Sequence, residues 1–512
     1  MVSTIYTAGF SGIEGFEVTV ECSVQNRVPR FDMVGLGDTA VKEAKERVRA
    51  AMENNHIPFP RADVMVNLAP ADRKKEGSAL DLAILLAILA GARLLPRELD
   101  TANKSFFGEL SLAGEIRPCH GILCLTLAAR EAGRTTIFVP KENAAEAAVV
   151  DGVTVYGIST LSELLAFLRG EIKLTPVRYD KNEFMRARDT SLLDFADVKG
   201  QSTAKRALEI AAAGGHNVLM VGPPGAGKSM LAKRLPGILP DLRFEEAVES
   251  TKIYSVAGLL KENLLTARPF RSPHHTASAV AMIGGGTNPR PGEISLAHNG
   301  VLFLDELPEF PKTLTESLRQ PLEDGGVTVT RAAARVNYPA RFMLVCAMNP
   351  CKCGNYGSRD KTCTCSPSDV RRYLDRVSGP LLDRIDIQIE LGPVSFDEMH
   401  KGPADGVRSA DIRARVNRAR EFATSRFPKG SGRFSNGALS PAEVRTFCVL
   451  DEGAEALLRG AFERLGLTAR GHDRILRVAR TIADLAESEL IRKEHLAEAI
   501  SYRNLDRKFW NR

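Results

Sequence analysis

Hydrophobic and polar residues alternate in two different periods along the first third of the chain. In some segments apolar side chains recur at every second position or in short unbroken runs, which is typical of β-strands. These strand-like segments cover residues 15–24, 61–70 and 135–140. Residues 39–55 (TAVKEAKERVRAAMENN) and 79–92 instead predict helices. Strands mixed with helices predict an α+β domain over residues 1–175.

A different pattern occupies residues 194–400, where short apolar runs are separated by helical segments and a glycine-rich loop. The runs in residues 300–305 (GVLFLD) and 340–347 are largely apolar without alternation, as expected for strands buried on both faces. This arrangement predicts a parallel α/β sheet covered by helices. The polar, irregular residues 176–193 precede it, and we interpret them as a linker.

The last part of the chain, residues 401–512, is predominantly helical. Helical segments separated by Gly and Pro signals begin near residues 411, 440, 451, 472 and 492. They predict a small helical bundle after a basic segment. A chain of 512 residues at roughly 150 residues per domain suggests about three domains. We therefore expect a multidomain α/β protein.

The composition and charge of the chain indicate where the protein is located and which partner it could contact. A content of 44% hydrophobic and 26% charged residues is ordinary for a globular protein. The first residues lack a secretory pattern, and the longest apolar run, residues 82–92, is too short to span a bilayer. We expect a cytoplasmic protein with no membrane partner, and nine cysteines, an odd number, argue against a disulfide framework. Residues 401–440 hold nine Lys or Arg and three Asp or Glu, which suits either nucleic acid contact or a solvated helix face.

A glycine-rich loop with the pattern G-x-x-x-x-G-K-[ST] follows the apolar run NVLMV and precedes a helical segment. Its glycines let backbone N–H groups converge on phosphates, Lys228 adds a positive charge, and Ser229 is suited to ligate Mg²⁺. The alternative, a glycine turn beside a surface lysine, leaves the flanking strand and helix unexplained. The predicted ATP-binding loop consists of Gly222, Pro223, Pro224, Gly225, Ala226, Gly227, Lys228 and Ser229.

Polar residues end the next two apolar runs. Asp305 is suited to hold the metal ion through water, and Glu306 to orient and deprotonate an attacking water. Asn349, which ends the run RFMLVCAMN, offers a neutral amide that can position the same water. These residues favour ATP hydrolysis over simple ATP binding. Arg384 lies between Asp383 and Asp386 and either forms a local ion pair or serves as an arginine finger for a neighbour's γ-phosphate.

Four of the nine cysteines fall within fifteen residues, in the pattern C-x-C-x9-C-x-C. Four thiolates complete a closed tetrahedral zinc site, and this polar loop has too little apolar content to fold on its own. We expect a structural Zn²⁺ ion held by Cys351, Cys353, Cys363 and Cys365. Free thiols and a redox switch are the alternatives.

Three long motifs make the chain resemble the magnesium-chelatase-like AAA+ ATPases of the bacterial competence branch. They are RPFRSPHHTASA, AMNPCKCG and the residues 284–310, and the resemblance covers nearly the whole chain. It implies a homo-hexameric ring with the nucleotide between subunits, a first sensor at Asn349, a second sensor at Arg474 and a C-terminal helical lid. It also implies a motor that acts on DNA and promotes branch migration during recombination in natural transformation, with recombination proteins among its partners. The alternative is a remodelling motor that acts on a protein or metal-insertion partner.

Two segments are candidates for DNA contacts within such a ring. Residues 326–342 predict a hairpin with Arg331 and Arg335 near its tip, and Arg268, Arg271 and Arg290 flank the glycines at 284–286. Phosphate contacts need cations but no base-reading geometry, which suits a motor indifferent to sequence. Bracing of a subunit interface is an equally good interpretation of these arginines.

The N-terminal domain resembles the Lon-type peptidase fold in residues 69–89 and 106–123. That pattern puts Ala79 at the nucleophile and Leu123 at the lysine of the peptidase dyad. Ser78 is adjacent, but the pattern supplies no base for it, so we expect no peptidase activity. Magnesium chelation is a second rival, and the D-x-S-x-S motif of its partner subunit is missing from this sequence.

Overall fold

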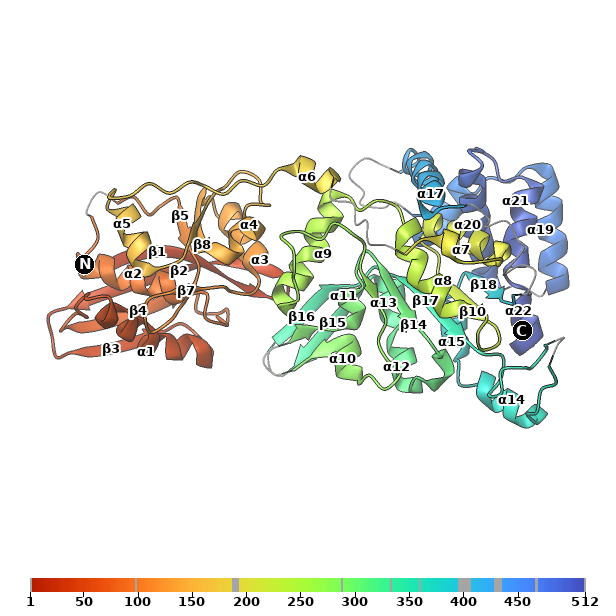
Figure 1. Ribbon diagram of the computed structural model, residues 1–512, viewed down its shortest axis with the longest axis horizontal. Helices are drawn as coiled ribbons and strands as arrows, with labels where there is room; N and C mark the ends of the chain where they lie inside the picture. Colours follow the sequence, from red (N-terminus) through yellow and green to blue (C-terminus); the bar gives the residue numbers. More distant parts are fainter. Residues whose placement is uncertain are drawn as a thin grey trace. The chain divides into compact units, whose positions relative to one another are not determined.

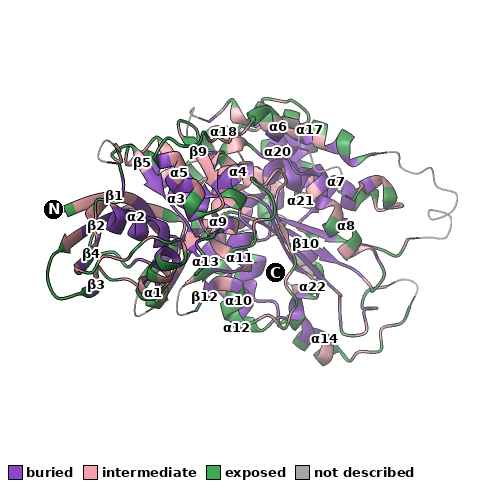
Figure 2. Cartoon of the chain, turned by 60° about the vertical axis from the view of Figure 1, so that its left-hand side comes forward, coloured by how far each residue is buried: buried purple, intermediate pink, exposed green. Residues whose placement is uncertain are grey.

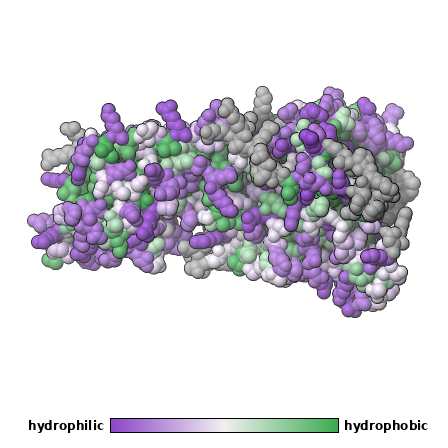
Figure 3. All heavy atoms as spheres, viewed as in Figure 1, coloured by the Kyte–Doolittle hydropathy of each residue, from purple (hydrophilic) through white to green (hydrophobic). Residues whose placement is uncertain are grey.

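The computed structural model describes residues 2–96, 99–186, 193–286, 289–331, 334–358, 361–394, 407–427, 435–465 and 468–510. Two compact units are distinguished (Figure 1): Met1–Arg188 with Phe244–Thr266, and Asp189–Arg243 with Ala267–Arg512. On the face seen in Figure 3, apolar residues are scattered among hydrophilic ones. Within the described residues, no helix combines the length and the apolar character needed to cross a bilayer.

The first unit is built around a four-stranded sheet in the order β1-β2-β4-β3. Its strands are β1 (Val2–Ser11), β2 (Glu14–Gln25), β3 (Arg30–Val34) and β4 (Asp63–Ala69). Helix α1 (Thr39–Asn54) begins at Asp38, whose side chain accepts a hydrogen bond from the Val41 N–H. Helix α2 (Asp81–Gly91) packs on β1 and β2 and is buried along nearly its whole length (Figure 2), which explains its continuous apolar sequence.

A second, parallel sheet in the order β5-β8-β9 completes this unit. It contains β5 (Lys104–Phe106), β8 (Thr136–Pro140) and β9 (Thr154–Ile158), and a short hairpin joins β6 (Glu109–Leu110) to β7 (Ile116–Arg117). The accompanying helices are α3 (Ile122–Glu131), α4 (Ala144–Ala147), α5 (Leu161–Leu168) and α6 (Lys181–Arg186). The sequence pattern did not indicate one feature: α9 (Phe244–Ala257) belongs to this unit and packs on α3, where the Gly121 N–H donates to the Ser255 carbonyl at 3.1 Å.

A buried ion pair joins α1 to α2. Arg47 contacts Asp81 through Nε at 2.6 Å and Nη2 at 2.9 Å, and the Asp81 side chain is 1% exposed. Burial raises the pKa of Asp81 to about 6, although the hydrogen bonds and charge of Arg47 act in the opposite direction. The folded pKa therefore lies above the unfolded value of about 3.9. The stability contributed by this carboxyl is complete at low pH and falls as pH rises through about 6.

Replacing Arg47 with alanine should destabilise the first unit by about 3 kcal/mol, because it leaves Asp81 buried and unpaired. Hydrogen exchange of the α1 and α2 peptides in the full chain should accelerate about 100-fold at pH 8, and less at pH 5, where Asp81 is protonated. Arg49 pairs with Glu53 on the exposed face of α1, so Arg49→Ala is the matched control. Equal exchange rates in the two variants would contradict the role of the buried pair.

The second unit contains a five-stranded, fully parallel sheet in the order β11-β14-β17-β10-β18. Its strands are β10 (Val218–Val221), β11 (Phe270–Arg271), β14 (Val301–Leu304), β17 (Met343–Met348) and β18 (Ile387–Glu390). Every residue of β10, β14 and β17 is buried, which explains why these strands show no alternation. The prediction of a parallel α/β sheet is confirmed.

Short helices and two hairpins surround this sheet. The helices are η2 (Phe195–Asp197), α7 (Ser202–Gly214), α8 (Lys228–Arg234), η3 (Leu235–Ile238), α10 (Ala279–Ile283), α11 (Glu293–Leu296), η4 (Leu307–Glu309), α12 (Lys312–Ser317), α13 (Arg319–Asp324), α14 (Pro367–Leu374) and α15 (Gly379–Leu382). One hairpin pairs β12 (Gly284–Gly285) with β13 (Arg290–Pro291), and the other pairs β15 (Gly326–Arg331) with β16 (Ala334–Pro339).

The C-terminal helices share a hydrophobic core with the parallel sheet. They are α17 (Ser409–Thr424), η5 (Asn436–Ala438), α18 (Pro441–Phe447), α19 (Glu452–Leu465), α20 (Ala469–Leu485), α21 (Lys493–Ser501) and α22 (Asn504–Trp510). Helix α20 is the most buried of them and packs on α7, α17 and α21. The sequence predicted these helices, and their action as a lid stays a prediction.

Candidate active site

The predicted phosphate loop connects the carboxyl end of β10 to the start of α8. Its glycines are needed for backbone conformation, because Gly225 and Gly227 have φ angles of 81° and 87°. A Cβ atom at either position would meet no atom within 4 Å, so the restriction comes from the left-handed backbone alone. Lys228 is the first residue of α8. The loop therefore has the strand-loop-helix context that a phosphate cradle requires.

Lys228 and Asn349 are 121 positions apart in sequence and meet at this edge of the sheet. Lys228 Nζ donates to the Asn349 Oδ1 at 3.0 Å and to the carbonyls of Gly222 and Pro223 at 2.7 and 2.9 Å. Burial lowers the pKa of Lys228, and the charges of Asp305 and Glu306 oppose that change. A cation held against loop carbonyls is placed to exchange them for phosphate oxygens.

Ser229 and Asp305, the two predicted magnesium ligands, also meet at this edge. The Ser229 hydroxyl donates to Asp305 Oδ2 at 2.5 Å. Asp305 Oδ1 accepts from the Glu306 N–H at 3.0 Å, which fixes the carboxylate. Hydroxyl and carboxylate oxygens are the ligands that Mg²⁺ prefers, so this donor set fits the ion.

Glu306 is the second residue after β14 and has a strained conformation, with a φ angle of 53° and a side chain that is 60% exposed. A non-glycine residue in this region costs about 1–2 kcal/mol, and such strain is concentrated at functional sites. His275 Nδ1 lies 3.6 Å from Glu306 Oε2, so a histidine faces the predicted general base. Sequence reasoning did not assign His275 to this site; its place in the motif RPFRSPHHTASA was the only available signal.

Arg384 does not pair with either neighbouring aspartate that the sequence suggested. Its guanidinium contacts the Glu323 carboxylate of α13 and donates to the Pro380 carbonyl at 2.6 Å, and its side chain is 12% exposed. Asp386 instead accepts from the Asn217 N–H at 3.2 Å. Arg384 is thus held within its own unit by an acid whose side chain is 54% exposed. Its role as an arginine finger stays a prediction.

Arg474 is buried in α20. Burial alone would raise the pKa of Asp386, but the hydrogen bond and charge of His216 and the charge of Arg474 lower it below its ordinary value. Asp386 precedes β18 at the amino edge of the sheet, whereas the phosphate loop follows the carboxyl edge of β10. The charge of Arg474 thus acts on Asp386, and the role of Arg474 as a second sensor stays a prediction.

The four clustered cysteines bring their sulfur atoms within 4.8 Å of one another. Cys351 Sγ lies 3.3 Å from Cys353 Sγ and 3.7 Å from Cys363 Sγ. The distance between Cys353 Sγ and Cys363 Sγ is 3.5 Å. A tetrahedral zinc ion with Zn–S bonds of about 2.3 Å separates its sulfur ligands by about 3.8 Å. The cluster, which Cys365 completes, therefore fits zinc with little adjustment.

The arginines proposed to touch DNA differ in how they are held. Arg335 on β16 and Arg290 on β13 are exposed, whereas the Arg331 side chain lies outside the described residues. Arg271 makes two contacts of 2.6 Å with the Glu293 carboxylate, and Arg268 donates to backbone carbonyls of Pro240 and Asn299 at 2.7 and 2.8 Å. The last two arginines thus stabilise the fold of the second unit.

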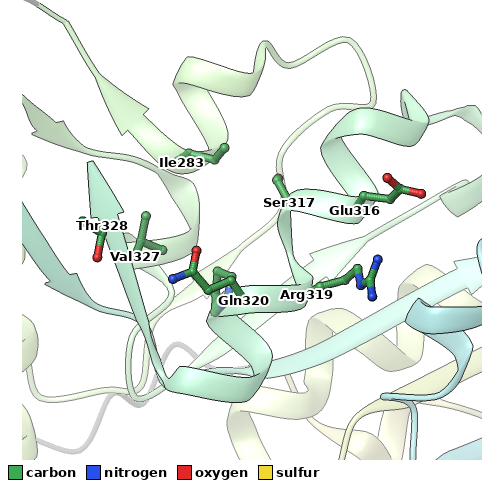
Figure 4. Close-up of a pocket in the computed structure, with 8 residues that line it drawn as sticks. Ile283, Glu316, Ser317, Arg319, Gln320, Val327 and Thr328 are labelled. Atoms are coloured by element: carbon green, nitrogen blue, oxygen red, sulfur yellow. The ribbon is translucent and has the colours of Figure 1, made fainter. Parts of the chain in front are cut away.

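A cavity of about 400 Å³ lies at the base of the β15–β16 hairpin (Figure 4). Its lining includes Glu316 and Arg319 together with Ile283 and Val327. None of the phosphate loop residues lines it, so this cavity is separate from the predicted nucleotide site.

The positions that correspond to a peptidase dyad are apolar and buried in the first unit. Ala79 is 8% exposed and Leu123 is fully buried. The Ser78 hydroxyl donates to the Glu109 carboxylate, and the Leu123 N–H donates to Glu146 Oε1 at 2.9 Å. The absence of peptidase activity stays a prediction, and the carboxylate of Glu109 beside Ser78 is a group that the sequence pattern did not indicate.

Comparison with known proteins matches three consecutive family models. They describe subunit ChlI of magnesium chelatase over residues 20–143, magnesium chelatase subunit ChlI over residues 194–399, and the C-terminal part of that subunit over residues 406–503. The first and last of these models match outside the parallel sheet.

Some known proteins are similar to this chain over nearly its full length. The chain is 43% identical to YifB of Escherichia coli strain K12 and 42% identical to the competence protein ComM of Haemophilus influenzae, over 99% of this chain and 98% of each relative. It is 26% identical to the magnesium-chelatase 38 kDa subunit of Rhodobacter capsulatus, over 61% of this chain and 92% of that protein. The chain belongs to the magnesium-chelatase-like family, in the group that contains ComM and YifB.

Proposed function

We propose that this protein is a ring-forming AAA+ ATPase that couples ATP hydrolysis to movement on DNA. The observation that supports it most is the convergence of Lys228, Ser229, Asp305 and Asn349 at one edge of the parallel sheet. These residues come from separate segments, and their side chains match the phosphate, magnesium and water contacts of ATP hydrolysis. Membership of the magnesium-chelatase-like family supports the same activity.

In this mechanism Lys228 and the loop N–H groups bind the β- and γ-phosphates. Ser229 and Asp305 would hold Mg²⁺, and the bound ion would neutralise charge on the phosphate oxygens. Glu306 orients a water molecule and accepts its proton, and Asn349 fixes the position of that water. The contact of 3.0 Å between Lys228 and Asn349 is exchanged for contacts to the nucleotide.

A second copy of the chain completes the site in this proposal. Arg384 leaves the Glu323 carboxylate and approaches the γ-phosphate bound to the neighbouring subunit, where its charge stabilises the transition state. The family resemblance supports a homo-hexamer as the closed form. Arg474 acts as the second sensor and the C-terminal helices as the lid, while the N-terminal domain has the Lon-type fold without its chemistry.

The DNA contacts are proposed at the two hairpins, where the side chains of Arg335 and Arg290 are exposed. The relative in Haemophilus influenzae is named a competence protein, which supports a role in competence. The activity that we propose within that role is branch migration during recombination in natural transformation. Remodelling of a protein or metal-insertion partner is the second candidate. It is supported by the similarity to the magnesium-chelatase 38 kDa subunit.

The ATPase rate with and without branched DNA separates these candidates. The expected result is stimulation by DNA at low salt that weakens steeply as salt increases, because phosphate contacts release counterions. Stimulation should fall in Arg335→Ala. It should persist in Arg372→Ala, a control whose arginine on α14 has a side chain that is 74% exposed. An ATPase rate that is indifferent to every DNA structure would remove DNA from the proposal and favour a protein partner.

A further inference from the structure

The cysteine loop packs directly on the phosphate loop. We call residues 351–365 the cysteine knuckle; residues 359–360 within it are outside the described residues. Gly354 lies at its centre, with a φ angle of 80°. A Cβ atom added there would stand 2.3 Å from Pro224 Cδ and 2.9 Å from Pro224 Cγ, which is closer than carbon atoms approach. Only a glycine allows the knuckle to lie this close to Pro224.

The knuckle also contacts the C-terminal helix α22. The Tyr356 and Phe509 rings have centroids 6.2 Å apart, and a Cβ atom at Gly357 would lie 3.7 Å from Lys508 Cε. Lys508 in turn contacts both carboxylate oxygens of Glu390, at 2.6 and 2.7 Å, at the end of β18. The knuckle is therefore positioned between the phosphate loop and α22, within one unit.

Apolar burial does not explain how the knuckle keeps this position. Among the described residues of the knuckle, only Cys351 and Gly354 are buried. These described residues form neither a helix nor a strand. Folding a polar segment of this kind requires another source of free energy, and metal binding supplies it in small cysteine-rich folds. Among the described residues of the knuckle, the group suited to bind a metal is the four cysteine sulfur atoms, which all lie within 4.8 Å of one another.

We propose that Zn²⁺ bound to the four cysteines holds the knuckle against Pro224, so that zinc occupancy sets the nucleotide affinity of the phosphate loop. With zinc bound, Pro224 is fixed and the loop N–H groups keep their phosphate-binding arrangement. Without zinc, the knuckle loses its fold, the phosphate loop loses its support, and ATP binds more weakly. This inference depends on the proposed nucleotide site and adds a metal that controls it.

Two glycine variants test the contact itself. Gly354 and Gly357 have nearly equal φ angles of 80° and 76°, so alanine introduces similar backbone strain at both, but only Gly354→Ala collides with Pro224. Both full-length variants should retain one zinc per chain by elemental analysis. The dissociation constant of a fluorescent ATP analogue should rise at least about tenfold more in Gly354→Ala than in Gly357→Ala. Equal affinities in the two zinc-loaded variants would overturn the inference.

Zinc removal tests the metal. A zinc-selective chelator that leaves Mg²⁺ in place should raise the same dissociation constant about tenfold or more, and added Zn²⁺ should restore it. Cys353→Ser with Cys365→Ser should lose zinc and bind the analogue as weakly as the chelated protein. Purified protein without zinc, or unchanged affinity after chelation, would overturn the inference and leave the proposed ATPase intact. Failure of the zinc-loaded chain to bind the analogue at all would instead refute the nucleotide site.

Discussion

Replacing Lys228 with alanine is expected to abolish nucleotide binding. Lys228 is 8% exposed, and its ammonium lies among the loop carbonyls and Asn349 Oδ1, where it contributes the positive charge nearest the predicted phosphates. A charge-assisted contact at a buried site is worth about 3 kcal/mol or more, so affinity should fall by at least about 100-fold. Titration with a fluorescent ATP analogue in the presence of Mg²⁺ measures the effect.

Lys233→Ala is the matched control, because Lys233 is exposed on the same short helix. Its affinity should equal that of the unmodified chain. Circular dichroism of Lys228→Ala verifies that the second unit remains folded. If folded Lys228→Ala bound the analogue normally, the loop at residues 222–229 would not be the phosphate site.

Replacing Glu306 with glutamine should separate binding from turnover. The amide keeps the shape of the side chain but does not accept a proton from water, so the ATPase rate should fall by about 10²–10⁴-fold. Affinity for ATP should remain, because Lys228, Ser229 and Asp305 are unchanged. Single-turnover hydrolysis of radiolabelled ATP, measured beside the binding titration, gives both quantities.

Glu309→Gln is the control for this variant. Glu309 follows Glu306 by three residues and its carboxylate contacts Arg376 at 3.0 Å, so its loss removes a nearby charge without touching the reacting water. Its turnover should stay close to that of the unmodified chain. Rapid hydrolysis by Glu306→Gln would mean that another group acts as the base.

The parallel sheet and the core of the site were predictable because both leave local signals in the sequence. Strands buried on both faces are continuous apolar runs, and parallel strands place Asp305 and Asn349 at the same carboxyl edge as the loop after β10. The spacing of the cysteines likewise indicated a cluster before any coordinates. Both signals come from residues that are close in sequence: the run of apolar residues within one strand, and the short spacing between the cysteines.

Contacts between distant segments left no comparable signal. Arg384 pairs with Glu323, 61 residues away, although two aspartates are closer in sequence. His275 lies near Glu306 because the strands β11 and β14, which precede these two residues, are neighbours in the sheet. The knuckle contacts Pro224 at Gly354, and a glycine in a loop does not by itself indicate such a contact, because glycines are common in turns. The sequence predicted residues 244–266 as part of the second unit, but they belong to the first. The helical period of this segment indicates which face is apolar and not which element that face packs against.

ATP hydrolysis at a site shared by two copies of the chain is tested most directly by mixing two inactive variants. Arg384→Ala keeps Glu306, and Glu306→Gln keeps Arg384, so a ring assembled from both contains some interfaces with every group intact. In an equal mixture about one quarter of the interfaces are intact. The expected ATPase rate is therefore about one quarter of the unmodified rate, while each variant alone remains nearly inactive. A mixture no more active than its components, or normal turnover by Arg384→Ala alone, would contradict a shared site.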